Sequence, residues 1–199
     1  MLRTRFFLGL VLVAALAGLT VAGAQSRATP SKATPSKAAP PGPAAPVIVF
    51  DTVKGVFEVE TFPQDAPKSV AHVLELVRRG FYRGLRFHWV QPGVIQAGDP
   101  LTRNLAKMDA WGTGNSGDPV RVAEVTKRIF VRGIVGLAYR AGFDVESSDS
   151  QFFVLRAANP ALDGKYIAIG RVTKGMEVVD KIEKADMLNL VYVKGETPK

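Results

Sequence analysis

The feature that most constrains this chain of 199 residues is an abrupt change in composition at Val47. Residues 1–46 hold five basic residues and no acid, whereas residues 47–199 hold the other 21 bases and all 18 acids, so that the net charge of +8 divides into +5 and +3. Only the second segment is rich in Val, Ile, Leu and Phe. Its 153 residues are enough for one substantial core, and we therefore predict a single folded domain over 47–199.

The charges and the absence of cysteine exclude several classes of function. Acids and bases are interspersed along 47–199, and no block of one sign is available to neutralise a run of phosphates, so we expect no nucleic-acid partner. The chain contains no cysteine, which excludes disulfides, thiolate nucleophiles and thiolate metal sites. The fold must therefore depend on its apolar core.

The first 24 residues have the layout of a secretory signal peptide. Arg3 and Arg5 precede an apolar run over 6–23, and the small side chains of Ala22 and Ala24 suit a signal peptidase. We predict cleavage after Ala24, export to a periplasmic or extracellular location, and only transient contact with a membrane. An uncleaved membrane anchor is the alternative, because the run approaches the roughly 20 apolar residues that span a bilayer.

Residues 25–46 are predicted to be a disordered linker. The near-repeat at 28–32 and 33–37, Ala-Thr-Pro-Ser-Lys, is followed by a stretch of Pro, Ala and Gly. Such a composition cannot form a core and favours an extended spacer with polyproline II character.

The pattern over 47–199 predicts a mainly β domain. Residues 47–61 read as a hairpin broken at Lys54-Gly55, and a helix begins near Pro67 and ends before Gly80. Further strands are predicted at 86–90, 94–97, 134–139, 151–155, 167–172 and 190–193, with a second helix at 175–185. Many short strands with two helices favour a closed β-barrel that the helices cover.

Seven motifs in one order resemble the cyclophilins, a family of peptidyl-prolyl cis/trans isomerases. They lie at 66–70, 80–84, 86–88, 95–100, 150–153, 162–166, and 170–172 together with 175–182. The resemblance implies a closed eight-stranded antiparallel β-barrel capped by two α-helices, with a peptide groove outside the barrel. It also implies that no cofactor or metal is needed, and we expect the domain to act as a monomer.

The resemblance assigns roles to residues by matching motif. Phe153 and Leu162 would form the floor of a proline pocket, with Ile95 or Val94 at its wall. The path of the peptide backbone would be lined by Gln96, Ala138 and Gln151. The glycine-rich loop 112–117, with Gly114, would let a substrate backbone approach closely, and Tyr166 stands where the family has a histidine. Just before Leu162, Ala161 replaces a frequent tryptophan.

The chain departs from the family at the position of its catalytic arginine. The family pattern Phe-His-Arg is replaced by Phe87-His88-Trp89, and the stretch from Phe87 to Gln96 is one residue short. If the gap is late, Trp89 occupies the arginine position; if it is early, His88 does. Trp89, His88, Gln96 and Phe153 are therefore the candidate catalytic residues.

Turning an X-Pro bond breaks amide resonance and no covalent bond, so the barrier of roughly 18–20 kcal/mol is conformational. A site needs only an apolar socket for the proline ring and polar groups that hold the flanking peptide. We expect an isomerase with reduced turnover that assists the folding of exported proteins and acts on unfolded or extended proline-containing polypeptides. The alternatives are a proline-peptide-binding or chaperone module without catalysis, and a purely structural exported barrel.

Overall fold

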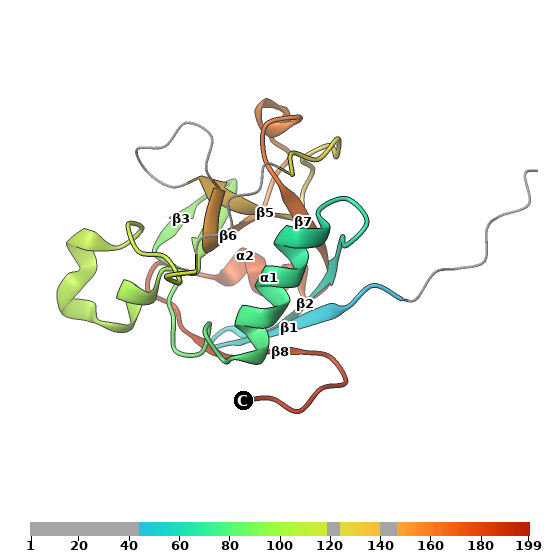
Figure 1. The fold of residues 1–199 in the computed structure, drawn as a ribbon. Coiled ribbons are helices and arrows are strands. Elements are labelled where there is room, and N and C mark those ends of the chain that lie inside the picture. Colours follow the sequence, from blue (N-terminus) through green and yellow to red (C-terminus); the bar gives the residue numbers. More distant parts are fainter. Residues whose placement is uncertain (1–43, 119–123, 140–146) are drawn as a thin grey trace, which may run out of the picture. The chain divides into compact units, whose positions relative to one another are not determined.

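A computed structural model describes residues 44–118, 124–139 and 147–199, all within a compact unit that spans Pro41–Lys199 (Figure 1). The predicted signal peptide and residues 25–43 of the predicted linker lie outside the described residues. Among the helices of the described part, none has the length and apolar character needed to cross a membrane.

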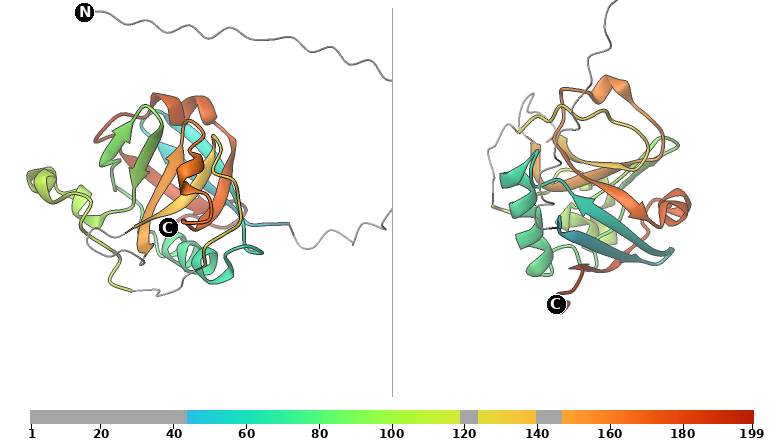
Figure 2. Two further views of the ribbon diagram at one scale, coloured as in Figure 1. Left: turned by 90° about the horizontal axis from the view of Figure 1, so that it is seen from above. Right: turned by 90° about the vertical axis from the view of Figure 1, so that its right-hand side faces the viewer.

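Eight antiparallel strands form one curled sheet, which confirms the prediction of a mainly β domain (Figures 1 and 2). Their order across the sheet is β3-β4-β6-β5-β7-β2-β1-β8. The strands are β1 (Val47–Thr52), β2 (Gly55–Thr61), β3 (Trp89–Gln91), β4 (Val94–Ala97), β5 (Ile134–Tyr139), β6 (Ser147–Leu155), β7 (Ala168–Lys174) and β8 (Leu188–Val193).

The two ends of this sheet, β3 and β8, are not paired with each other as strands. The chain just before each of them makes the connection instead, through an isolated bridge between Arg86 and Met187. Beside this bridge, Leu188 donates its backbone N–H to the carbonyl of Leu85 at 2.8 Å. The continuous ladder is therefore a curled sheet, and full closure into a barrel stays a prediction.

The predicted hairpin at the start of the domain is present. Strands β1 and β2 pair from Val47↔Glu60 to Thr52↔Gly55. Gly55 has a φ of 124°, which a residue with a Cβ rarely adopts, so glycine suits the point where the turn enters β2.

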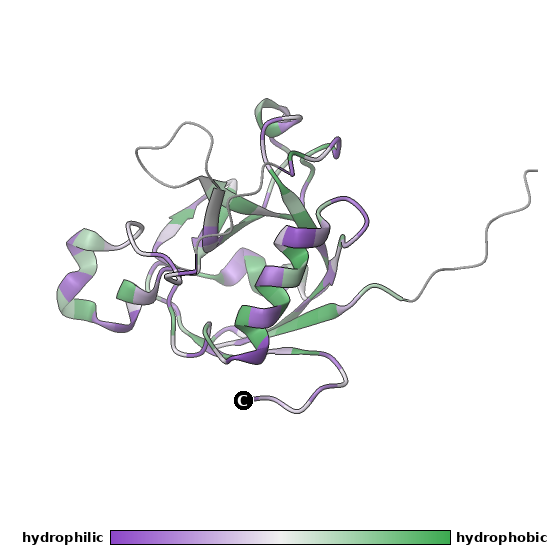
Figure 3. Cartoon of the chain, in the orientation of Figure 1, coloured by the Kyte–Doolittle hydropathy of each residue, from purple (hydrophilic) through white to green (hydrophobic). Residues whose placement is uncertain are grey.

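Two α-helices are described, and the second is shorter than the sequence predicts. Helix α1 (Pro67–Arg78) begins with proline in its first turn, buries Val70, Val73, Leu74 and Val77, and contacts β6 and β8. Figure 3 shows its alternation of hydrophobic and hydrophilic residues. Helix α2 (Met176–Lys181) ends because Ile182 is extended, at ψ 133°.

Three short 3-10 helices were not predicted from the sequence: η1 (Pro100–Arg103), η2 (Leu105–Ala110) and η3 (Pro160–Leu162). The first two connect β4 to the glycine-rich loop, and the third precedes the Asp163-Gly164 turn.

The buried apolar side chains form two clusters. The larger one, which we call the interior core, includes Phe50, Phe57 and Phe152. The smaller one, the outer cluster, contains Phe62, Phe130, Ile134, Ala138, Phe153, Leu155 and Ala168, with Val94, Leu162 and Tyr166 partly buried against it. Adjacent residues of β6 belong to different clusters, because successive side chains of a strand point to opposite faces.

Candidate functional site

The outer cluster opens into a cavity of about 220 Å³. Its lining comes from strands β3, β4, β5 and β6 and from the segment around η3. The lining residues are Trp89, Val94, Gln96, Ala138, Phe153, Leu155, Asn159, Leu162 and Tyr166. Seven of the eleven residues predicted for the site are therefore brought together, although they come from distant parts of the chain.

Phe153 is held in place by three neighbours. Its ring meets Tyr166 edge-on, with centroids 5.6 Å apart, and Phe130 at 6.1 Å. On the adjacent strand, a Cβ built on Gly136 would lie 2.5 Å from the tip of the Phe153 ring. The missing side chain of Gly136 therefore leaves the room that this ring occupies.

The hairpin of β3 and β4 forms one wall of the cavity. Trp89 pairs with Gln96, and Gln91 with Val94, across the two strands. Trp89 is 49% exposed, so one part of the indole contacts the cavity and another part faces solvent.

Of the two residues proposed for this wall, Val94 lines the cavity and Ile95 does not. Ile95 is fully buried in the interior core. The strand alternation decides this, because Val94 and Gln96 share one face of β4 and Ile95 lies on the other. The assignment of Ile95 to the site is corrected accordingly.

Gln151 lies behind the wall and connects it to the glycine-rich loop. Gln96 donates from Nε2 to Oε1 of Gln151 at 2.9 Å. Gln151 in turn donates from Nε2 to the carbonyls of Gly112 and Gly114, at 2.9 and 2.7 Å. Since Gln151 is only 4% exposed, this chain of hydrogen bonds fixes the Gln96 amide from inside the protein.

Gly114 is not among the residues that line the cavity, and a second buried side chain holds it. Oδ2 of Asp99 accepts the backbone N–H groups of Gly112 and Gly114, and its Oδ1 accepts that of Leu101 at the start of η1. A Cβ on Gly114 would lie 2.2 Å from Oδ1 of Asp99. Glycine therefore allows the loop to pack closely on Asp99.

His88 is buried and does not line the cavity. It is 8% exposed, and a Cβ built on Gly112 would lie 3.5 Å from its Cδ2. Burial lowers the pKa of His88, while the charge of Asp99 and a contact with Gln151 act in the opposite direction. His88 is thus a neutral group near neutral pH, packed behind the glycine-rich loop.

Two residues of the lining, Leu155 and Asn159, were not predicted from the sequence. Leu155 was detectable, because it follows Phe153 by two positions on a strand and must share its face. Asn159 carries no such signal. It is placed by a backbone hydrogen bond of 2.8 Å from its N–H to the carbonyl of Phe130.

Among the described residues of the lining, none has a side chain that is charged at neutral pH. An apolar floor with an amide and an indole at one wall suits a small apolar ring whose flanking backbone is polar. Such a cavity can bind and orient a peptide, and a conformational reaction needs no more than that.

The fold and the site together define a class of mainly β protein. In this class the cavity lies on the outer face of the curled sheet, and the interior core lies on the other face. The family model described as cyclophilin type peptidyl-prolyl cis-trans isomerase/CLD matches residues 47–197, and the chain belongs to this family of isomerases. The prediction of a cyclophilin-type isomerase is confirmed.

Relatives from bacteria and plants support the same family. The chain is 42% identical over 141 residues to a probable peptidyl-prolyl cis-trans isomerase of Brucella abortus (strain 2308), covering 69% of this chain and 71% of the relative. It is 36% identical over 146 residues to a peptidyl-prolyl cis-trans isomerase of Helicobacter pylori, covering 70% and 82%. It is 33% identical over 142 residues to an Arabidopsis thaliana isomerase, covering 69% and 80%.

Solved structures show a similar fold. A cyclophilin-type isomerase of Cryptosporidium parvum, determined in the presence of the dipeptide Ala-Pro, has a TM-score of 0.64 at 22% identity and covers 75% of this chain and 99% of that chain. A cyclophilin of Hirschia baltica has a TM-score of 0.58 at 23% identity, covering 76% and 74%.

Proposed function

We propose that the protein catalyses cis/trans isomerisation of X-Pro bonds in unfolded or extended polypeptides. The observation that carries this proposal is the cavity of about 220 Å³ with the ring of Phe153 in its floor. It is apolar, open to solvent and bordered by polar groups, as a site for a proline ring in a continuous chain requires. The Cryptosporidium parvum structure was determined in the presence of the dipeptide Ala-Pro, which contains an X-Pro bond of the kind proposed here as the substrate.

The residues of the cavity have different roles in the proposed reaction. Phe153 and Leu162 hold the proline ring, so that the ring stays fixed while the preceding residue turns. Gln96, which Gln151 orients, binds the peptide backbone beside the proline. Fixing these groups in advance lowers the entropic cost of reaching the twisted amide.

Trp89 is the residue we place where the family has its arginine. It lies opposite Gln96 and contacts the cavity, whereas His88 is buried elsewhere, and this favours the late position of the one-residue gap. In the twisted state the proline nitrogen regains a lone pair. The indole N–H is a neutral donor toward it, about half as strong as a charged guanidinium, so turnover is reduced and not abolished.

The decisive experiment follows X-Pro exchange in a short peptide by NMR, with the natural protein and Trp89→Arg. We expect the natural protein to accelerate exchange and Trp89→Arg to exceed it by about tenfold, as a charge-assisted hydrogen bond replaces a neutral one. Acceleration by Trp89→Arg alone would instead make the natural protein a proline-peptide-binding module. If neither variant accelerates exchange or binds the peptide, the proposal is wrong.

We also propose that the protein is exported and assists the folding of exported proteins. The support is the sequence of the first 24 residues, with Arg3 and Arg5 before an apolar run and small residues at 22 and 24. Fractionation of cells and N-terminal sequencing should find a product that begins at Gln25. A product that begins at Met1 and sediments with membranes would favour the anchor, and a cytoplasmic product would refute export.

A further inference from the structure

The wall that carries Trp89 is held weakly by the sheet itself. Strand β3 has three residues, lies at one end of the sheet and, among the strands that the structure describes, pairs only with β4. Val90 and Ile95 attach the inner side of the hairpin to the interior core. A strand this short at an edge has few hydrogen bonds to oppose local opening.

Arg156 joins this hairpin to the strand that forms the floor. It follows Leu155 at the end of β6, and its backbone N–H donates to the carbonyl of Gly93, in the turn of the hairpin, at 2.8 Å. The N–H of Ala157 donates to the same carbonyl at 3.3 Å. The turn is thus tied to the end of β6 by the two residues that follow the lining residue Leu155.

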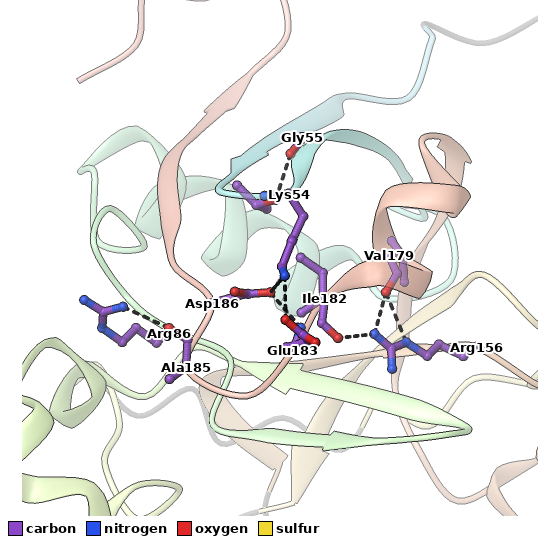
Figure 4. Close-up of polar contacts among 10 residues, drawn as sticks. Lys54, Gly55, Arg86, Arg156, Val179, Ile182, Glu183, Ala185 and Asp186 are labelled. Carbon is purple, nitrogen blue, oxygen red and sulfur yellow. Dashed lines mark hydrogen bonds and ion pairs between the residues drawn. The ribbon is translucent and has the colours of Figure 1, made fainter.

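The side chain of Arg156 extends from there to the end of helix α2 (Figure 4). Its Nε and Nη2 donate to the carbonyl of Val179 at 3.0 and 2.7 Å, and Nη2 also donates to that of Ile182 at 2.5 Å. Nη1 lies 3.4 Å from the carbonyl of Gln91, the last residue of β3. The carbonyls at a helix end lack helical partners, and the planar guanidinium can bind several acceptors at once.

Open space separates the hairpin from α2 at this place. A cavity of about 670 Å³ is lined on one side by Val90, Gln91 and Pro92 and on the other by Lys54 and 180–183. Arg156 also lines this cavity and bonds to both sides. Its guanidinium therefore connects two elements where apolar packing is incomplete.

The far end of this connection is itself fixed. Arg132 donates to both carboxylate oxygens of Asp180, at 2.9 and 2.5 Å, and to the carbonyl of Arg156. From the β1–β2 turn, Lys54 pairs with Glu183 at 2.6 Å (Figure 4). The end of α2 and the segment after it are therefore joined to the chain before β5 and to the β1–β2 turn where Arg156 binds them.

We propose that Arg156 is a positioning residue of the isomerase site. It holds the β3–β4 hairpin between β6 and the end of α2, and so sets the distance of Trp89 and Gln96 from Phe153. Arg156 does not touch the substrate. This inference rests on the proposed function insofar as the site is that of an isomerase.

The test compares the natural protein with Arg156→Met, Arg156→Lys and the control Arg171→Met, below their unfolding temperatures. Arg171 is an exposed arginine that pairs with Glu60 at 3.0 Å on another part of the surface. The measurements are amide hydrogen exchange in β3 and β4, kcat and KM for a short X-Pro peptide, and the affinity for that peptide.

In Arg156→Met we expect the hairpin amides to exchange about tenfold faster than in the natural protein. We also expect kcat/KM to fall about tenfold, mainly through kcat, because a displacement of the groups of a site by about 1 Å lowers the rate by up to about a hundredfold. Arg156→Lys keeps the positive charge but loses the planar guanidinium that binds several carbonyls, so both effects should be intermediate. Arg171→Met should match the natural protein in these measurements. Arg156→Lys also serves if Arg156→Met does not fold.

Two further outcomes separate this inference from the proposed function. If the natural protein has no isomerase activity but Arg156→Met still loosens the hairpin and weakens proline-peptide binding, the positioning role stands and the proposed function fails. Arg156 is not a positioning residue if both variants match the natural protein within twofold in two respects. These are the exchange rate of the hairpin amides and either kcat/KM or the affinity for the peptide.

Discussion

Phe152 and Phe153 are neighbours on β6 and have opposite surroundings. Phe152 lies in the interior core, with ring centroids 5.2 Å from Phe50 and 5.7 Å from Tyr82. Phe153 lies in the outer cluster and borders the cavity. Both are almost completely buried, at 2% and 5% exposure, so burial alone does not distinguish them.

The difference teaches that the two faces of one sheet have separate tasks. The buried side chains of the interior core are at most 7% exposed, so each of them contributes contacts to stability. The outer cluster is incomplete, and the contacts that it lacks are those a ligand can supply. Substitutions on the two faces should therefore separate stability from peptide binding.

The largest expected effect is the loss of stability in Phe152→Ala. Truncating a fully buried phenylalanine typically lowers the free energy of unfolding by about 3–5 kcal/mol. Urea unfolding should show this loss, while the fraction that remains folded keeps its affinity for proline peptides. A variant with normal stability would break the comparison, since Phe152 would then contribute nothing to the core.

Phe153→Ala should instead act mainly on the site. Removal of a buried aromatic anchor costs about 2 kcal/mol of binding, so the Kd for a proline peptide should rise about thirtyfold. The loss of stability should be smaller than in Phe152→Ala, since one side of the ring borders the cavity. Titration with peptide and urea unfolding measure both, and a larger stability loss than in Phe152→Ala would contradict the division of tasks.

Gly136→Ala tests whether the position of the Phe153 ring in the floor of the cavity matters for peptide binding. The added Cβ would lie 2.5 Å from the Phe153 ring, which must move toward the cavity. Such overpacking typically costs about 1–3 kcal/mol, and we expect weaker peptide binding together with a moderate loss of stability. The matched control is Gly93→Ala, where an added Cβ meets no atom within 4 Å. Unchanged peptide binding in Gly136→Ala would show that the ring position is not critical.

The smallest effect concerns His88 and pH. Burial lowers the pKa of His88 in the folded state below its ordinary value of 6.5. As the pH falls below about 6.5, the unfolded chain therefore binds a proton that the folded chain does not, and stability decreases until the folded-state pKa is reached.

His88→Gln should flatten this part of the stability profile, measured by urea unfolding at a series of pH values. His72→Gln, which replaces the other of the two histidines, is the control. An unchanged slope in His88→Gln would mean that His88 is not the group responsible.

Local patterns predicted most of the secondary structure. The hairpin at Lys54-Gly55 and the start of α1 at Pro67 follow from turn and capping preferences that a few neighbouring residues determine. The early end of α2 was not predictable in this way. The carbonyl of Val179 in α2 and that of Ile182 just after it both accept from Arg156, which is distant in sequence.

The candidate site was predicted through motifs, and the structure selected among the options. The motifs identified Phe153, Gln96 and Leu162 but left Val94 and Ile95 as alternatives for one wall. The pairing of β4 decided for Val94, because a strand presents alternate residues to one face. The buried position of His88, behind the loop that Asp99 and Gln151 hold, could not be read from the motif.

By itself, the sequence determined the family, the mainly β class and most of the residues of the pocket, since these depend on local order and on motifs. Only the tertiary structure decided which neighbour faces the cavity, which ring rests against Gly136 and which arginine spans the gap beside the hairpin. Those outcomes depend on strand register and on contacts between residues far apart in the chain, and neither can be inferred from a local sequence pattern.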